Sequence, residues 1–232
     1  MNPASEDTAT QQPPIPQATS VSEALLVLGL PLAYFAALQA WQVSTGSGPA
    51  YTNRGLWMVV ALEIAFGTIA LAVLRRRQWT WSTVSEPPTW GDLGRALLLY
   101  IATLLLFRFG LAIQELVVSA AKWVPREPLS SERPAVTTIL ALVVVNPLYE
   151  EGLWLAYILN GPGRRHERTG IALSLACRTS MHLYQGWSAL FGIAPIGLML
   201  AWYYTRSRRL LPPVLAHSML NLVSSLPYVR HT

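Results

Sequence analysis

Seven apolar segments, each long enough to cross a lipid bilayer, constrain the fold of this chain more than any other feature. Their approximate bounds are 22–42, 55–74, 93–119, 135–159, 170–188, 189–205 and 210–229. A helix needs about 20 residues to cross a bilayer, and in lipid every backbone polar group must be bonded within the protein. The sequence therefore predicts an all-α fold, a polytopic membrane bundle of about seven transmembrane helices.

The composition is that of a membrane protein. Of the 232 residues, 52% are hydrophobic and only 12% are charged, whereas about a quarter of a typical soluble chain is charged. The formal charge of +5 comes largely from short basic clusters between apolar segments, which is typical of topology signals, so we do not expect nucleic-acid binding. The single cysteine, Cys177, excludes an intrachain disulfide and a thiolate metal cluster.

Basic clusters after the second, fourth and sixth apolar segments predict the orientation of the bundle. They comprise Arg75, Arg76, Arg77 and Arg95, then Arg164, Arg165 and Arg168, and then Arg206, Arg208 and Arg209. All three clusters fall on one side, which the positive-inside rule makes cytoplasmic. Residues 1–20 are rich in Pro, Gln, Ser and Thr, so we expect a disordered cytoplasmic tail before one membrane domain of residues 21–232. The Trp-containing stretch 78–92 is expected to lie along the cytoplasmic interface.

Two adjacent carboxylates, Glu150 and Glu151, lie inside the apolar segment 135–159. On insertion scales an acidic residue at the centre of a membrane helix costs about 2.5 to 3.5 kcal/mol, so such residues need partners, a water-filled cavity or a function. The apolar run from Ile139 to Val145 leaves no polar helix face for a position on the protein surface. We therefore interpret the pair as a functional site within the membrane.

Two further polar pairs interrupt later apolar segments, Arg178 with His182 and His217 with Asn221. The members of each pair are four residues apart, so they share one face of a helix. A rise of about 1.5 Å per residue places Glu150, His182 and His217 roughly 16, 20 and 12 Å from the cytoplasmic helix ends. A lone membrane histidine is more often a helix contact, but a desolvated Glu is a strong base, and His and Asn can donate to a developing oxyanion. Together these residues predict a hydrolase site.

The motifs resemble, in their order, those of the CAAX protease and bacteriocin-processing family, also called the ABI or type II CAAX prenyl protease family. That family carries Glu-Glu-x-x-x-Arg, then Phe-x-x-x-His, then His-x-x-x-Asn or Asp; here the motifs fall within 146–221. Glu150 and Glu151 match the start of the first motif, His182 the end of the second, and His217 with Asn221 the third. The resemblance implies that Glu150 and His182 hold and activate the hydrolytic water, with Glu151 beside them. It also implies that His217 and Asn221 stabilise the oxyanion. We expect no metal cofactor.

Two positions depart from the family pattern. Leu155 stands where the first motif has arginine, and Arg178 stands where the second has phenylalanine. Adjacent buried carboxylates repel one another unless a cation stabilises their ionised forms, so we expect Arg178 to support the site by supplying the missing charge. The alternative is that Arg178 pairs with Glu63 or Glu115 and holds helices together. For Glu63, the sequence leaves Arg108 and Arg178 as possible partners.

The sequence as a whole predicts an intramembrane endopeptidase that cleaves a membrane-associated protein or peptide. We expect it in a bacterial cytoplasmic membrane, with its N-terminus in the cytoplasm. A zinc-dependent variant with Glu150, His182 and His217 as ligands stays open. So do a small proton-coupled transporter and a non-catalytic membrane scaffold, although a transporter more often shows symmetry between its halves. The substrate, its prenylation and the oligomeric state are also left open.

Overall fold

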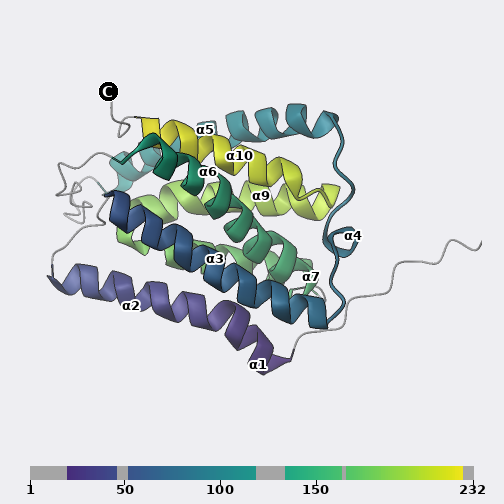
Figure 1. Cartoon of the computed structure of the whole chain (residues 1–232). Coiled ribbons are helices and arrows are strands. Elements are labelled where there is room, and N and C mark those ends of the chain that lie inside the picture. The colour runs from purple at the N-terminus through teal and green to yellow at the C-terminus, as the bar shows by residue number, and fades with distance from the viewer. Residues whose placement is uncertain (1–19, 46–51, 119–133, 164–165, 227–232) are drawn as a thin grey trace, which may run out of the picture.

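The computed structural model describes residues 20–45, 52–118, 134–163 and 166–226, and these ranges form helices and no strand (Figure 1). The first helical run consists of α1 (Val21–Ala24), a π-helical turn (Leu25–Gly29) and α2 (Leu30–Thr45). It begins at Ser20, whose side chain caps the helix by accepting from the Glu23 N–H. Apart from Ser20, the tail predicted for residues 1–20 lies outside the described residues.

The second and third long helices are α3 (Asn53–Arg76) and α5 (Gly91–Val118), with the short α4 (Trp81–Val84) between them. The stretch around α4 packs on the turn that follows α9. The Tyr204 hydroxyl donates to the Val84 carbonyl, and the Glu86 N–H donates to the Arg208 carbonyl at 2.8 Å. Trp90 in this stretch is 90% exposed. The stretch thus connects the α3–α5 linker to the end of α9 and the turn that follows it.

The remaining elements contain the residues of interest. They are α6 (Val136–Glu151), the π-helix η2 (Gly152–Tyr157), α7 (Ile158–Asn160), α8 (Glu167–Met181), the 3₁₀ turn η3 (Leu183–Gln185), the π-helix η4 (Ala189–Ile193), α9 (Ala194–Ser207) and α10 (Leu211–Ser225). The expected helix 170–188 is shorter than predicted, because α8 ends at Met181 and His182 is its C-cap. Gly186 has a φ of 66°, a conformation that glycine adopts without strain and that cannot continue a helix.

Four helical runs in the described part of the chain are long and apolar enough to cross a membrane. They are Val21–Trp41, Asn53–Arg76, Gly91–Val118 and Val136–Asn160. Large apolar side chains on these helices face outward, for example Leu98 at 70% and Phe109 at 65% exposure, as expected for helices that face lipid. The chain is therefore a multi-pass integral membrane protein. The prediction of seven spans is met only in part, because α8, α9 and α10 have 15, 14 and 15 residues.

The run from α6 through η2 to α7 occupies the centre of the bundle, and α6 packs between α3 and α10 (Figure 1). Trp154, Leu155, Tyr157 and Ile158 within this run are fully buried. Trp154, Tyr157 and Ile158 join an apolar cluster with residues of the first helical run and α3, whereas Leu155 joins a second cluster with residues of α9 and α10. The central run therefore has apolar partners on two sides, and its polar residues are enclosed by other helices.

Candidate active site

Glu150 and Glu151 end α6 at the point where the helix changes from α to π geometry. Pro147 lies within α6 and η2 begins at Gly152; proline lacks the N–H that a helix interior requires, and π turns often occur at functional sites. Glu150 is 6% exposed and Glu151 is fully buried. Both carboxylates therefore lie in the interior, on a helix whose backbone is locally irregular.

Glu151 is held by two basic side chains from other helices. Arg178 Nη2 on α8 donates to Glu151 Oε2 at 2.6 Å, and His217 Nδ1 on α10 lies 2.7 Å from Glu151 Oε1. Arg178 Nη1 is also 3.6 Å from Glu150 Oε2. One buried guanidinium therefore contacts both carboxylates, as proposed from the sequence for a chain with Leu155 at the family's arginine position. The alternative partners of Arg178, Glu63 and Glu115, make no ion pair with it among the described residues.

Glu150 is held by an amide on its own helix. Asn146 Nδ2 donates to Glu150 Oε1 at 3.0 Å and to Glu63 Oε1 on α3 at 2.6 Å. Asn146 Oδ1 accepts from Asn221 Nδ2 on α10 at 2.8 Å. The possible pairing of Glu63 with Arg108 or Arg178 is therefore wrong, because Glu63 accepts a hydrogen bond from the Asn146 amide on α6 instead. The sequence reasoning assigned Asn146 no role, although its position four residues before Glu150, in an apolar run, was the available signal.

His182 approaches the cluster from the end of α8. Its Nδ1 lies 2.9 Å from the Arg178 carbonyl oxygen, and its ring stacks on Tyr184 with a centroid distance of 6.2 Å. Glu150 lies within electrostatic range of both His182 and His217. The structure thus brings together all the residues singled out from the sequence, namely Glu150, Glu151, Arg178, His182, His217 and Asn221, from α6, α8, its C-cap and α10.

The described residues contain no group of three or more His, Cys, Asp and Glu side chains arranged to hold a metal ion. Glu150, His182 and His217, the ligands considered for zinc, are included in that finding. In the conformation described, these three side chains are not arranged around a common metal position.

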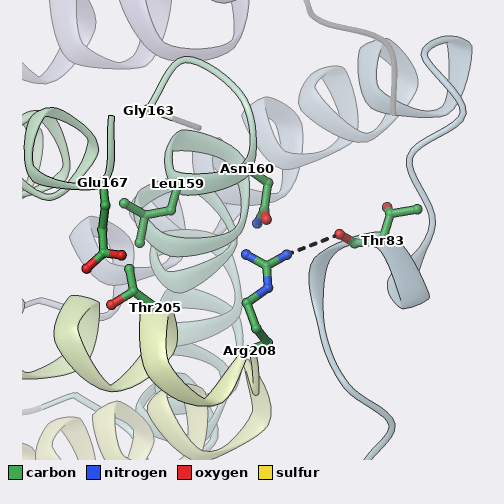
Figure 2. Close-up of a pocket in the computed structure, with 7 residues that line it drawn as sticks. All are labelled: Thr83, Leu159, Asn160, Gly163, Glu167, Thr205 and Arg208. Atoms are coloured by element: carbon green, nitrogen blue, oxygen red, sulfur yellow. Dashed lines mark hydrogen bonds between the residues drawn. The ribbon is translucent and has the colours of Figure 1, made fainter. Parts of the chain in front are cut away.

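A separate cavity of about 330 Å³ lies where α7, α8 and α9 approach the stretch around α4 (Figure 2). Figure 2 shows the Arg208 guanidinium between Asn160 and Thr83, and its Nη2 donates to the Thr83 carbonyl at 3.5 Å. Glu167 lies at the other side of the cavity. This cavity includes none of the motif residues, so we assign no catalytic group to it.

A comparison with protein families matches part of the chain. The family model described as type II CAAX prenyl endopeptidase Rce1-like matches residues 132–223, a segment that includes each motif residue from Glu150 to Asn221. No curated protein and no solved structure matches the chain. Residues 132–223 of this chain therefore match the Rce1-like family of type II CAAX prenyl endopeptidases, a family of peptide-bond hydrolases.

Proposed function

We propose that this protein is an intramembrane endopeptidase in which Glu150 activates water for attack on a peptide bond of a membrane-associated protein or peptide. The observation that supports this proposal most directly is that Glu150 Oε2 is available to accept a proton. This oxygen is buried and has no hydrogen-bond partner in the described part of the chain, and Arg178 Nη1 lies 3.6 Å away. A carboxylate oxygen that is removed from bulk water and has a vacant lone pair is suited to accept a proton from water.

His182 supplies the second contact to that water. Because its Nδ1 lies 2.9 Å from the Arg178 carbonyl, Nδ1 carries the hydrogen and Nε2 of the neutral ring is an acceptor. One water hydrogen then points to His182 Nε2, and the other moves to Glu150 Oε2 as the water oxygen attacks the substrate carbonyl. The proton on Glu150 passes to the amine that leaves, which returns the carboxylate to its starting form.

His217 and Asn221 stabilise the oxyanion that forms on the substrate. Glu151 Oε1 lies 2.7 Å from His217 Nδ1 and accepts from it, which orients the ring; in the proposed step Nε2 donates to the oxyanion, and the Glu151 carboxylate balances the charge of a ring that donates through both nitrogens. Asn221 uses one amide hydrogen on Asn146 Oδ1 at 2.8 Å and keeps the second for the oxyanion. Preorganised donors of this kind are often the largest single contribution to an enzyme's rate.

The proposed membrane arrangement extends to the shorter helices. A helix of 15 residues, such as α8 or α10, spans roughly 22 Å, whereas the bilayer core is about 30 Å thick. Adjoining turns such as η4 before α9 add length, and α10 packs against both α5 and α6. We therefore assign all seven helical runs to a bacterial cytoplasmic membrane, with the basic clusters and the N-terminus on the cytoplasmic side.

The test compares wild type with Glu150→Gln, because glutamine keeps the shape of glutamate but does not accept the proton. Comparative membrane proteomics of the two strains identifies a protein that accumulates uncleaved, and purified enzyme is then assayed on it. We expect cleavage to fall by about 10²-fold or more with an unchanged unfolding temperature. Wild-type turnover by Glu150→Gln would overturn the assignment.

A strong chelator provides the control for the zinc alternative. We expect the cleavage rate of the purified wild-type protein to be unchanged by chelation. A loss of activity that added zinc restores would transfer the mechanism to the metal-dependent variant.

A further inference from the structure

A single side-chain amide joins the two functional halves of the proposed site. Asn146 donates one hydrogen to Glu150 Oε1 at 3.0 Å and the other to Glu63 Oε1 at 2.6 Å, and it accepts from Asn221 Nδ2 at 2.8 Å. Rotation of this amide by 180° would place its oxygen against two carboxyl groups, so the contacts fix its orientation. Residues of α3, α6 and α10 therefore meet at one group.

These contacts decide which atoms of the site are left for chemistry. Glu150 Oε1 is occupied by Asn146, so Oε2 is the oxygen that can take a proton from water. Asn221 is held through one hydrogen, so its second hydrogen has a defined direction. A displacement of about 1 Å at a reacting group can cost on the order of 10²-fold in rate, and Asn146 restrains the base and the oxyanion donor together.

Glu63 on α3 restrains Asn146 by accepting one of its amide hydrogens. Its side chain is 4% exposed, no Lys, Arg or His of the described ranges forms an ion pair with it, and its Oε2 has no hydrogen-bond partner there. An unpaired buried carboxylate is costly, so Glu63 holds a proton on Oε2 and uses Oε1 as a neutral acceptor. Glutamine has the same shape and the same acceptor oxygen as this neutral acid.

From these contacts we propose that Asn146 and Glu63 are positioning residues of the peptidase, which orient Glu150 and Asn221 without touching the substrate. The proposal rests on the function proposed above. It assigns Glu63, on a helix outside the segment 132–223 that matches the family, a role in the reaction. The N-terminal half of the chain thus contributes to the site through the hydrogen bond between Glu63 and Asn146.

The experiment measures kcat, KM and the unfolding temperature for Asn146→Ala, Glu63→Leu, Glu63→Gln and the double variant Asn146→Ala/Glu63→Leu. We expect kcat to fall about 10²-fold for Asn146→Ala and about 10-fold for Glu63→Leu, with KM nearly unchanged. Glu63→Gln should keep most of kcat, because the acceptor remains. The double variant should be no slower than Asn146→Ala, because both residues act through the same amide.

Asn53→Ala is the matched control. Asn53 Oδ1 accepts from the Ala135 N–H at 2.7 Å and from Thr138 Oγ1 at 2.8 Å, so it also joins α3 to the start of α6, but far along the helix from Glu150. This variant should lower the unfolding temperature and leave kcat unchanged. Equal losses of kcat in Asn53→Ala and Glu63→Leu would mean that only helix packing matters, and would overturn the positioning role.

Two other outcomes separate this inference from the proposed function. If Glu150→Gln is inactive while Glu63→Leu and Asn146→Ala keep wild-type kcat, the positioning role is wrong and the protease assignment stands. If Glu150→Gln is active, the proposed function itself has failed. Should Asn146→Ala fail to fold, Glu63→Leu tests the same link without altering α6, and inactive Glu63→Gln would rule out the neutral-acid role.

Discussion

Arg178 is the cation on which the two site carboxylates depend. Its side chain is 3% exposed, and its guanidinium lies 2.6 Å from Glu151 and 3.6 Å from Glu150. Each carboxylate would otherwise repel its neighbour in a medium that screens charge poorly, and one of them would take up a proton. The contacts favour the interpretation that Arg178 substitutes for the arginine missing at Leu155.

Arg178→Leu should therefore remove cleavage and lower the free energy of unfolding by about 3 to 5 kcal/mol, the usual cost of breaking a buried charge cluster. Leu155→Arg alone should also destabilise, because Leu155 is fully buried in an apolar cluster with Leu200 and Ala201. In the double variant, the new arginine lies four residues after Glu151 and should restore part of the cleavage. Cleavage and thermal unfolding are measured for both single variants and the double variant. Recovery in the double variant supports the view that Arg178 replaces the family's arginine, whereas additive damage contradicts it.

His217 and Asn221, the proposed oxyanion donors, should contribute mainly to kcat. His217→Ala and Asn221→Ala should each lower kcat by about 10² to 10³, with a smaller effect on KM, since their hydrogen bonds form mainly in the transition state. His166→Ala, at the exposed start of α8, is the matched control and should keep the wild-type kcat. Steady-state kinetics measure the difference, and an effect confined to KM would point to substrate binding instead.

Close packing between α5 and η4 depends on glycine residues in both elements. A Cβ atom on Gly110 would lie 1.7 Å from the Phe191 carbonyl oxygen, and one on Gly192 would lie 2.6 Å from the Phe107 ring. Small residues allow membrane helices to approach closely, which is a main source of their association. The η4 turn leads directly into α9, where Gly197 leaves room for Arg178, since a Cβ there would lie 2.9 Å from Arg178 Cδ. The α5–η4 contact thus positions the helix that supports the site cation.

Gly110→Ala should therefore lower the unfolding temperature in detergent strongly, because the methyl group meets rigid backbone. Gly94→Ala on the same helix is the control, since nothing lies within 4 Å of its added Cβ. Alanine is favoured over glycine in a helix by about 1 kcal/mol, so Gly94→Ala should be as stable as wild type or more stable. Similar losses in both variants would show that an added methyl group destabilises α5 without the contact with Phe191, and would contradict the packing role of Gly110.

The predicted orientation places the ends of the second, fourth and sixth helical runs on the cytoplasmic side of the membrane. Cys177 is buried, and its replacement by alanine provides a cysteine-free background for single labels. Gln78 and Pro162 are exposed and follow the second and fourth helical runs, Arg206 is exposed in the last turn of the sixth, and Ser44 is exposed at the end of the first. In intact cells, a membrane-impermeant maleimide should label Ser44→Cys and should label the other three variants only after lysis.

The opposite labelling pattern would invert the orientation. Different behaviour among Gln78→Cys, Pro162→Cys and Arg206→Cys would instead contradict the number of spans between them. The experiment therefore tests the seven-helix arrangement separately from the positive-inside prediction.

The sequence by itself determined the class of fold, the central segment and the residues of the candidate site. Hydrophobicity and residue spacing are properties of short stretches, so the polar residues from Glu150 to Asn221 stood out against their apolar neighbours without any knowledge of packing. The same local rules placed most helix ends within a few residues. They extended the fifth helix past His182, because a glycine at positive φ cannot be distinguished by composition from a glycine within a helix.

Only the tertiary structure decided which polar groups are partners. The sequence left four possible partners for Arg178, namely Glu63, Glu115, Glu150 and Glu151. Its contacts with Glu150 and Glu151 depend on how α8 is rotated against α6. Asn146 became the shared group for the same reason, since α3 and α10 both pack against α6 and each brings a side chain within hydrogen-bond distance of its amide. Such choices depend on the rotation and approach of whole helices, which arise from the sum of many packing contacts across the bundle. No single stretch of sequence contains that sum.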